Sequence, residues 1–413
     1  MEVMFNDRPP LPLVVRLMNG MERLGKILVS LDVTELLDTA RKKTGLEDYG
    51  ESAFLAGLYR YVESLENDAD LTTLGRITAR AGIMQCLTNR LAVIDHFKKH
   101  PEIKKEEIRR PLFIIGLPRT GTTILQALLD CDPGNRSLLS WEALSVFPPP
   151  RPETYRTDPR IRTIQRQFDQ LYRLIPGFDA VHLMAADIPQ ECVTLFGHEF
   201  LSVQFFVQFN VSSYQDWLDD QDMRPAYAWH RRMLQFLQSG GVKNERWLLK
   251  SPAHVYCIDE LLSTYPDAAI IHTHRDPMSV ITSIASLICM LRSISSDNVD
   301  PRMVARQQLD WWEKLLCRTV EQRKRNEHRL SQFYDLRLDE IVSDPIGSVE
   351  KIYRHFDFKF TQEVRQRMKR FIEENPRDKH GNHVYRHDDF GIDPAAESRR
   401  FSEYIEYFKI KGT

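Results

Sequence analysis

The chain has 413 residues, 42% of them hydrophobic, and its 56 Lys and Arg against 58 Asp and Glu leave a net charge of −2. This composition excludes a mainly disordered protein, and a chain of this length buries a large core. It gives no overall basic field, so neither nucleic acid nor an anionic membrane surface is the expected partner.

Cysteine usage and the first residues bear on the cellular compartment. The six cysteines are scattered, without a Cys-x-x-Cys pair, which favours a reducing environment. Glu2 and Asp7 stand where a signal or transit peptide avoids acidic residues. The longest charge-free stretches, 200–215 and 277–291, fall short of the roughly 18 apolar residues of a membrane span and predict buried helices. We expect a cytoplasmic protein with no membrane span, and its oligomeric state stays open.

Residues 1–110 predict a helical N-terminal region. Apolar residues recur at helical spacing in 27–37, 54–65 and 83–97, with charged residues between them. The stretch 98–110 mixes lysines and arginines with glutamates, which is typical of a solvated helix face or a connector.

An α/β core is predicted over residues 111–360. The apolar run Leu112–Ile115 ends at Gly116 and precedes a helical pattern over 122–129, as expected for a buried parallel strand and its helix. Further strands are predicted at 247–249, 268–272 and 333–336. Strand–loop–helix units of this kind predict a parallel sheet covered by helices, which is a three-layer α/β fold.

Two segments are added to this core. Between about 151 and 245 the strand patterns stop, and aromatic residues at helical spacing predict a helical insertion. Residues 361–413 predict a C-terminal tail that is helical and then irregular.

The loop after the first strand has the clearest chemical pattern, Gly116-Leu-Pro-Arg119-Thr120-Gly121-Thr122-Thr123. The two glycines let the backbone wrap around an anion, which then faces the loop N–H groups and the helix N-terminus. Threonine hydroxyls add donors, and Arg119 adds a fixed positive charge. A nucleoside triphosphatase loop has the same glycine spacing, but its lysine position is Thr122 here. We expect an anion-binding loop, with a structural turn as the alternative.

A second polar group follows the strand predicted at 268–272. Arg275 lies just beyond the strand end, where open α/β sheets bind ligands, and Ser283 lies two turns into the next helix. A guanidinium and a hydroxyl in this arrangement suit one phosphate group. The alternative is an ion pair between Arg275 and Asp276, with Ser283 packed inside the helix.

Three motifs resemble, in order, those of the sulfotransferases that use 3′-phosphoadenosine 5′-phosphosulfate (PAPS). They are the glycine loop, Trp247-Leu-Leu-Lys250-Ser251-Pro252, and Arg275 with Ser283, and the match covers roughly residues 112–286. The long helical N-terminus and the segment PGFDAVHLMAADIPQEC resemble the large microbial-type branch. The Lys-x-Pro segment is also similar to the tyrosylprotein sulfotransferase branch.

The resemblance implies a P-loop-like three-layer sheet, PAPS as donor and no metal. It implies that Arg275 and Ser283 hold the 3′-phosphate. The 5′-phosphosulfate is then held by Arg119, Thr120, Gly121, Thr122 and Thr123.

Catalysis in such an enzyme is expected to depend on positioning and on stabilising charge at the leaving oxygen. The resemblance gives this second role to Arg119 and Lys250. Two histidine pairs have spacings that also suit zinc, but they are expected to be core or surface residues; they are His272 with His274 and His380 with His383.

The proton acceptor is left open between two residues. In the cytosolic branch of the family a histidine follows the lysine by two positions, and this position is Pro252 here. Glu142 resembles the glutamate base of the tyrosylprotein branch, and His254 lies four residues after Lys250. The alternatives are that Glu142 is an ordinary helix carboxylate and that His254 caps or packs the following helix.

The acceptor site is expected within the insertion. His182, Asp187 and Glu191 either line the pocket or form a lid held by its own hydrogen bonds. The aromatic run Phe200, Phe205, Phe206 and Phe209 is more typical of core, although it also suits an apolar acceptor. In the tail, Arg377, Lys379, His380 and Gly381 fall where the family's C-terminal loop closes on the 3′-phosphate.

The sequence therefore predicts a sulfotransferase that moves the sulfuryl group of PAPS to a hydroxyl or amine of an unidentified small-molecule acceptor. The alternatives are a P-loop nucleotide kinase or NTPase, and a non-catalytic nucleotide-binding protein on the same fold. Whether a sulfated product is final or an activated intermediate is left open.

Overall fold

A five-stranded parallel sheet forms the centre of the computed structural model, which describes residues 16, 19, 22–174, 183–375 and 387–410. Its strand order is β2-β3-β1-β4-β5. The strands are β1 (Leu112–Gly116), β2 (Asn135–Ser137), β3 (Arg246–Lys250), β4 (Ala269–His274) and β5 (Phe333–Arg337). All four neighbouring pairs are parallel, so the carboxyl ends of β3, β1 and β4 lie together at one edge. The predicted three-layer α/β fold is confirmed.

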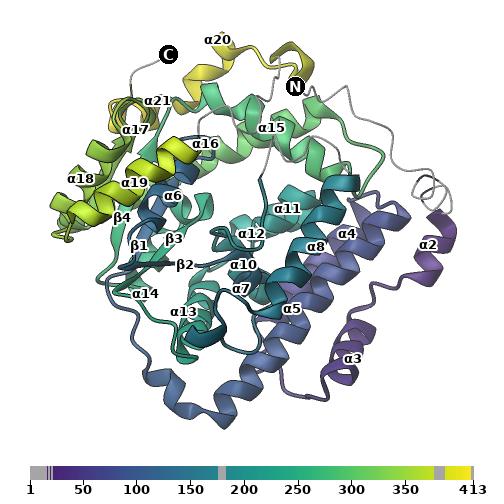
Figure 1. Ribbon diagram of the computed structural model, residues 1–413. Helices are drawn as coiled ribbons and strands as arrows, with labels where there is room; N and C mark the ends of the chain where they lie inside the picture. The colour runs from purple at the N-terminus through teal and green to yellow at the C-terminus, as the bar shows by residue number, and fades with distance from the viewer. Residues whose placement is uncertain (1–15, 17–18, 20–21, 175–182, 376–386, 411–413) are drawn as a thin grey trace.

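One face of the sheet is covered by helices from both ends of the core. Leu112 and Ile114 of β1 and Ile271 of β4 point into this layer, where they pack with leucines of the helix after the glycine loop. The helices of this layer are α6 (Thr122–Asp130), α17 (Leu338–Ser343), α18 (Pro345–His355) and α19 (Gln362–Glu374). Figure 1 shows them beside the strands, on the side away from α13.

The other face is buried under a much larger helical layer. Phe113 and Ile115 of β1 alternate with the residues of the first face and enter the main core. The neighbouring helices are α13 (Arg224–Ser239), α14 (Ile258–Thr264), α15 (Met278–Arg292), α16 (Pro301–Arg325) and the 3-10 turn η5 (Pro252–Tyr256). Near the C-terminus, α20 (Pro394–Glu397) and α21 (Ser402–Tyr407) follow, and α21 packs on α16.

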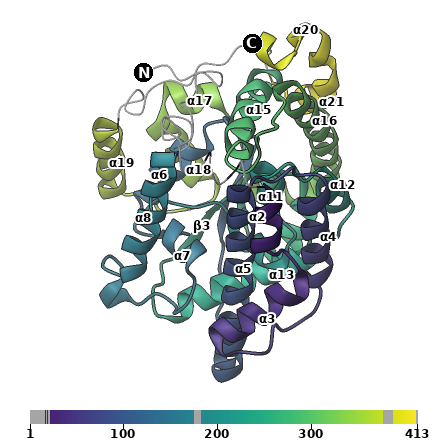
Figure 2. The same cartoon turned by 90° about the vertical axis from the view of Figure 1, so that its right-hand side faces the viewer.

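The N-terminal region is helical, as predicted. Its helices are α2 (Glu22–Leu28), α3 (Val33–Thr44), α4 (Phe54–Asn67) and α5 (Thr73–Lys99). Figures 1 and 2 both show α3, α4 and α5 on the far side of the molecule from α19. One core cluster joins these helices to the insertion and to the sheet, so the division of the chain at residues 110 and 360 stays a prediction.

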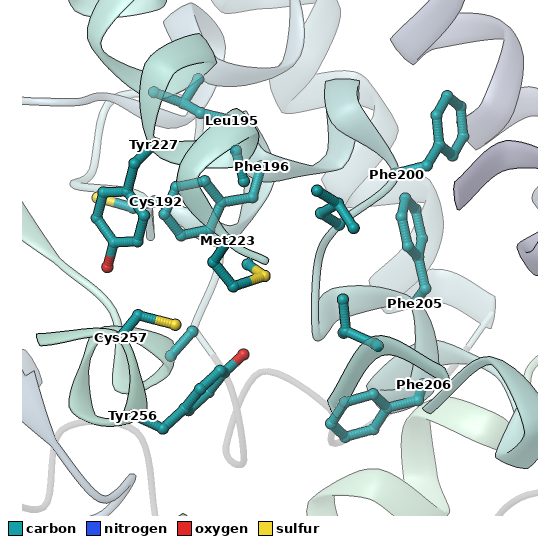
Figure 3. Packing of buried hydrophobic residues seen from close by; sticks show 14 of the residues in the cluster. Cys192, Leu195, Phe196, Phe200, Phe205, Phe206, Met223, Tyr227, Tyr256 and Cys257 are labelled. Carbon is teal, nitrogen blue, oxygen red and sulfur yellow. The ribbon is translucent and has the colours of Figure 1, made fainter. Parts of the chain in front are cut away.

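The described part of the insertion is also helical. Together with the segment before it, it contains α7 (Ser140–Leu144), α8 (Pro159–Leu174), α10 (Val193–Phe196), α11 (Gln204–Gln208) and α12 (Ser212–Asp219). Phe200, Phe205 and Phe206 point into the packed interior in Figure 3, and none is more than 4% exposed. The aromatic run is therefore core, and it is closed to an acceptor.

Two predicted helices are interrupted. The stretch 27–37 breaks before α3, because the Asp32 side chain accepts a hydrogen bond from the Glu35 N–H and starts a new helix. The stretch 200–215 is not one helix but the short helices α11 and the start of α12. Phe200 has a left-handed backbone with φ +52°, and the Tyr214 hydroxyl donates to the Phe200 carbonyl and accepts from the Ser202 N–H, which satisfies the broken turn.

Candidate active site

The glycine loop leaves the end of β1 in a conformation that only glycine adopts without strain. Gly116 has φ +136°, and a Cβ there would lie 2.4 Å from both the carbonyl oxygen and the Oγ1 of Thr273 on β4. The sequence therefore needs glycine at this position to let the loop start against the neighbouring strand.

The far end of the loop is open to an anion. Gly121 is the N-cap of α6 with φ +86°, and no side chain caps the first turn. The first N–H groups of α6 are thus left for a ligand, on the positive end of the helix dipole. Arg119 has a left-handed backbone with φ +66° and an exposed side chain, and it has no acidic partner among the described residues.

The three threonines of the loop have different roles. The Thr120 hydroxyl is fully buried, lies 2.6 Å from the Leu117 carbonyl and 2.7 Å from the Thr273 hydroxyl, and so holds the loop to β4. It is not available as a ligand donor, and Thr120 contributes its N–H alone. Thr122 is 5% exposed and Thr123 is exposed, and neither hydroxyl is bonded to another described residue.

Arg275 lies directly beside this loop. Its Nη1 donates a hydrogen bond of 3.2 Å to the Arg119 carbonyl. The alternative ion pair is absent from the described residues: the Asp276 carboxylate instead accepts the Met278 N–H at 3.0 Å and starts α15. Ser283, two turns into α15, is 4% exposed and has no hydrogen-bond partner in the described chain. Neither Arg275 nor Ser283 is therefore bonded to an anionic group among the residues that the structure describes.

Lys250 ends β3 on the other side of the loop. Its Nζ donates to Glu191 Oε1 at 2.6 Å, while the Lys250 carbonyl accepts the Cys192 N–H at 3.0 Å. The Lys250 side chain is 8% exposed and that of Glu191 is 28% exposed. This pair joins the insertion to the carboxyl edge of the sheet, and Glu191 is its solvent-facing member.

Glu142 is not placed as a free base. It is 0% exposed and accepts hydrogen bonds from Arg136 Nη2 at 2.7 Å, from the Tyr155 hydroxyl and from the Leu139 N–H. The Arg136 guanidinium lies 4.0 Å from the centroid of the Trp247 ring, near the amino end of β3. Glu142 therefore forms a buried ion pair with Arg136 and, through the Leu139 N–H, holds the start of α7. Its predicted role as proton acceptor lacks support in this geometry.

His254 is also part of the interior. Its ring is fully buried against Phe113 and Phe196, and its Nδ1 lies 2.7 Å from the Tyr227 hydroxyl. Burial holds the pKa of His254 well below its usual range. The packing alternative therefore describes His254 better than the base.

The two buried histidines on β4, His272 and His274, belong to a hydrogen-bond network with Asp335 and Arg323. His272, His274 and Asp335 bring their ligand atoms within 4.8 Å of one another, which alone suits a metal ion. However, Arg323 binds both Asp335 oxygens at 2.8 Å and lies 3.1 Å from His272 Nδ1. A guanidinium in this position disfavours a cation, so the donor set does not fit a metal.

Several predicted residues remain to be placed. Asp187 is exposed on the segment that leads to Glu191. The others lie outside the described residues and have no structural account; they are His182, Arg377, Lys379, His380, Gly381 and His383.

The fold and the site define a class of protein. The glycine loop, Arg275 and Lys250 meet at the carboxyl edge of three adjacent parallel strands, which is where open α/β sheets bind phosphorylated ligands. The chain is thus an α/β protein of the P-loop-like kind.

Comparisons with known proteins give the family. The model of the sulfotransferase family matches residues 111–362. The solved sulfotransferase STF1 from Mycobacterium tuberculosis H37Rv is 33% identical, covers 90% of this chain and 98% of its own, and has a TM-score of 0.79. Sulfotransferase STF9 from Mycobacterium avium is 29% identical over 92% of this chain and 97% of its own, with a TM-score of 0.82. The chain belongs to the sulfotransferase family.

A curated relative is more distant. The omega-hydroxy-beta-dihydromenaquinone-9 sulfotransferase Stf3 of Mycobacterium bovis is 26% identical over 255 residues, which span 59% of this chain and 62% of that protein. Among the helices that the structure describes, none combines the length and apolarity that a membrane crossing requires.

The contact that sequence reasoning missed is the pair of Lys250 and Glu191. Glu191 was considered as part of the acceptor pocket, but no sequence signal paired it with a lysine 59 residues away. The pattern of acidic residues in DIPQE was the available hint.

Proposed function

We propose that this chain transfers a sulfuryl group from PAPS to a hydroxyl group of a small-molecule acceptor. The observation that carries the proposal is the contact of Arg275, which follows β4, with the glycine loop, which follows β1. Lys250 ends β3, the strand on the other side of β1. Three cationic groups from distant parts of the sequence thereby face one edge of the sheet. The comparisons do not favour the nucleotide kinase alternative.

The residues at this edge fit a donor that carries phosphate groups on the 3′ and 5′ positions of one ribose. The uncapped N-terminus of α6, with Arg119, Gly121, Thr122, Thr123 and the Thr120 N–H, suits the 5′-phosphosulfate. Arg275 and the unpartnered Ser283 hydroxyl suit the 3′-phosphate. When bound, PAPS supplies the sulfuryl group and carries the phosphate leaving group.

Lys250 and Arg119 supply positive charge for the leaving oxygen. The Lys250 side chain is largely buried, and a buried charge acts more strongly than one in water. Its ion pair with Glu191 fixes the direction of the ammonium group. Arg119 adds a guanidinium from within the loop.

Glu191 replaces Glu142 and His254 as the proposed proton acceptor. Only its Oε1 contacts Lys250, and its Oε2 has no partner among the described residues. A carboxylate beside the cation at the leaving group is within reach of a hydroxyl that approaches the same point. Glu191 would take the hydroxyl proton at Oε2, while Lys250 holds the carboxylate in place.

The hydroxyl acceptor and the cytoplasm are finer parts of the proposal. The printed name of the Mycobacterium bovis relative describes a hydroxylated menaquinone derivative as its acceptor, which supports a hydroxyl acceptor here. The six cysteines are all free thiols, which supports a reducing compartment.

The test is transfer of labelled sulfate from PAPS to a panel of alcohols and amines. Wild-type protein should sulfate an alcohol without added ATP, and Arg119→Ala should lower the rate at least 100-fold. Arg109→Ala is the matched control, because Arg109 is an exposed arginine that pairs with Glu107 and lies away from the loop in sequence. The desulfated donor, adenosine 3′,5′-bisphosphate (PAP), serves as the binding probe. If PAP binds normally and no acceptor in the panel is sulfated, the result would support the non-catalytic alternative.

A further inference from the structure

One hydroxyl group, that of Thr273 on β4, contacts the glycine loop at both of its ends. Its Oγ1 lies 3.1 Å from the carbonyl oxygen of Ile115, just before β1 ends. The same atom lies 2.7 Å from Oγ1 of Thr120, near the other end of the loop. The Thr120 hydroxyl also lies 2.6 Å from the Leu117 carbonyl oxygen. The Thr273 side chain therefore joins the two ends of the loop to each other and to β4.

These hydroxyl groups are shielded from solvent. Thr273, Thr120, Ile115 and Leu117 are all fully buried. A buried hydroxyl that loses its partner has no water to replace it, so removal of one partner is unfavourable. We therefore expect the contacts among these residues to hold the loop in one arrangement.

The residue before Thr120 has an unusual backbone. Arg119 has φ +66°, a left-handed conformation that residues with a side chain rarely adopt and keep only where their surroundings hold it. Thr120 is fixed on one side of it, and Arg275 Nη1 donates to the Arg119 carbonyl at 3.2 Å. The Arg119 side chain is exposed, so packing does not set its direction. The backbone conformation therefore decides the direction in which the guanidinium leaves the loop.

We propose that Thr273 is a positioning residue for Arg119. Through Thr120, its hydroxyl keeps Arg119 in the left-handed conformation and so directs the guanidinium to the 5′ end of the donor. The inference rests on the proposed function, which places Arg119 at the 5′-phosphosulfate. Thr273 is itself buried, so it acts on the donor only through the loop.

Calorimetric binding of PAP tests this role without an acceptor. Thr273→Val removes the hydroxyl and keeps a side chain of nearly the same size, whereas Thr273→Ser keeps the hydroxyl. The apparent affinity falls with the fraction of protein in the binding conformation, and one lost hydrogen bond lowers this fraction about three- to tenfold. We expect this loss of PAP affinity in Thr273→Val, and an affinity within about twofold of wild type in Thr273→Ser.

The decisive comparison repeats Thr273→Val in Arg119→Ala protein. Arg119→Ala should itself lower PAP affinity about tenfold or more, because it removes a charged hydrogen-bond donor. If Thr273 acts through the Arg119 guanidinium, the double variant should bind PAP within about twofold of Arg119→Ala. A full three- to tenfold further loss would overturn the proposal, and so would a Thr273→Val protein with normal PAP affinity. If wild-type protein does not bind PAP at all, the proposed function fails, and this inference fails with it.

Urea unfolding separates positioning from a general loss of stability. Thr319 on α16 is the matched control, because it is also fully buried and its hydroxyl bonds to the Val255 and Leu315 carbonyls. Thr319→Val should unfold at lower urea, as Thr273→Val does, yet keep PAP affinity within about twofold of wild type. An equal loss of PAP affinity in Thr319→Val would overturn the proposal. If Thr273→Val does not fold, Thr120→Val breaks the same contact and is held to the same expectations.

Discussion

Replacing Glu142 and Glu191 separately distinguishes a structural carboxylate from a proton acceptor. Glu142→Gln removes the charge that faces Arg136, whose side chain is 3% exposed, while leaving a side chain of nearly the same size. Glu191→Gln makes the same chemical change beside Lys250, at a side chain that is 28% exposed. The two variants are therefore a matched pair.

The size of each effect follows from burial. Loss of one partner of a buried ion pair costs about 3–5 kcal/mol, and the amide of glutamine still accepts from Arg136, so we expect about 3 kcal/mol for Glu142→Gln. The Glu191 pair is nearer the solvent, so its loss should cost at most about 1 kcal/mol. Loss of a general base lowers kcat about 10²- to 10⁴-fold, which we expect for Glu191→Gln alone.

Urea unfolding and sulfate transfer from PAPS measure the two effects on the same preparations. Glu142→Gln should unfold at clearly lower urea and keep kcat within a few fold at a temperature where it stays folded. A Glu142→Gln protein of normal stability with kcat lowered 100-fold, or a Glu191→Gln protein with normal kcat, would refute the assignment.

Three further predictions concern the loop, the lysine and pH. Gly116→Ala places a Cβ 2.4 Å from the Thr273 carbonyl, so the glycine loop must shift and PAP affinity should fall at least tenfold. The control is Gly82→Ala on an open face of α5, which should leave PAP binding unchanged and stabilise the protein by about 0.5–1 kcal/mol. Lys250→Met should lower kcat about 10²- to 10³-fold with little change in PAP affinity, and a normal kcat would remove Lys250 from the reaction. Burial lowers the pKa of His198 to about 4, so between pH 6.5 and 4 the unfolded chain takes up a proton that the folded chain refuses. The contribution of neutral His198 to the free energy of unfolding should therefore be complete above pH 6.5 and fall as the pH drops, by at most about 1.4 kcal/mol per pH unit. In urea unfolding, His198→Gln should make this pH dependence less steep.

The central strands and the loop were predictable because their signals are local. β1 is a short apolar run that ends at a glycine, and the loop after it has its glycines, arginine and threonines in a contiguous stretch. Arg275 and Ser283 were proposed as a pair from their spacing across the end of β4 and the start of α15, and their role toward a phosphate stays a prediction. β2 was not predicted, because Asn135–Ser137 is short and polar and is a strand only through its pairing with β3.

The proposed proton acceptor, Glu191, was not predictable from spacing, because the proposal depends on burial and pairing. Glu142 follows the helix after the loop in sequence, yet Arg136 and Tyr155 enclose it. Glu191 meets Lys250 only because the insertion folds back along residues 138–141. Neither contact leaves a periodic trace in the sequence.

The central claim is that the loop near Arg119 holds the 5′-phosphosulfate of one donor while Arg275 and Ser283 hold its 3′-phosphate. Calorimetric binding of PAP and of adenosine 5′-monophosphate, which lacks the 3′-phosphate, tests it in wild type and in Arg275→Ala. We expect wild type to prefer PAP, and Arg275→Ala to lose about 10- to 100-fold of that preference, since a hydrogen bond to a charged group contributes about 1.5–3 kcal/mol. An Arg275→Ala protein that prefers PAP as strongly as wild type does would contradict the account.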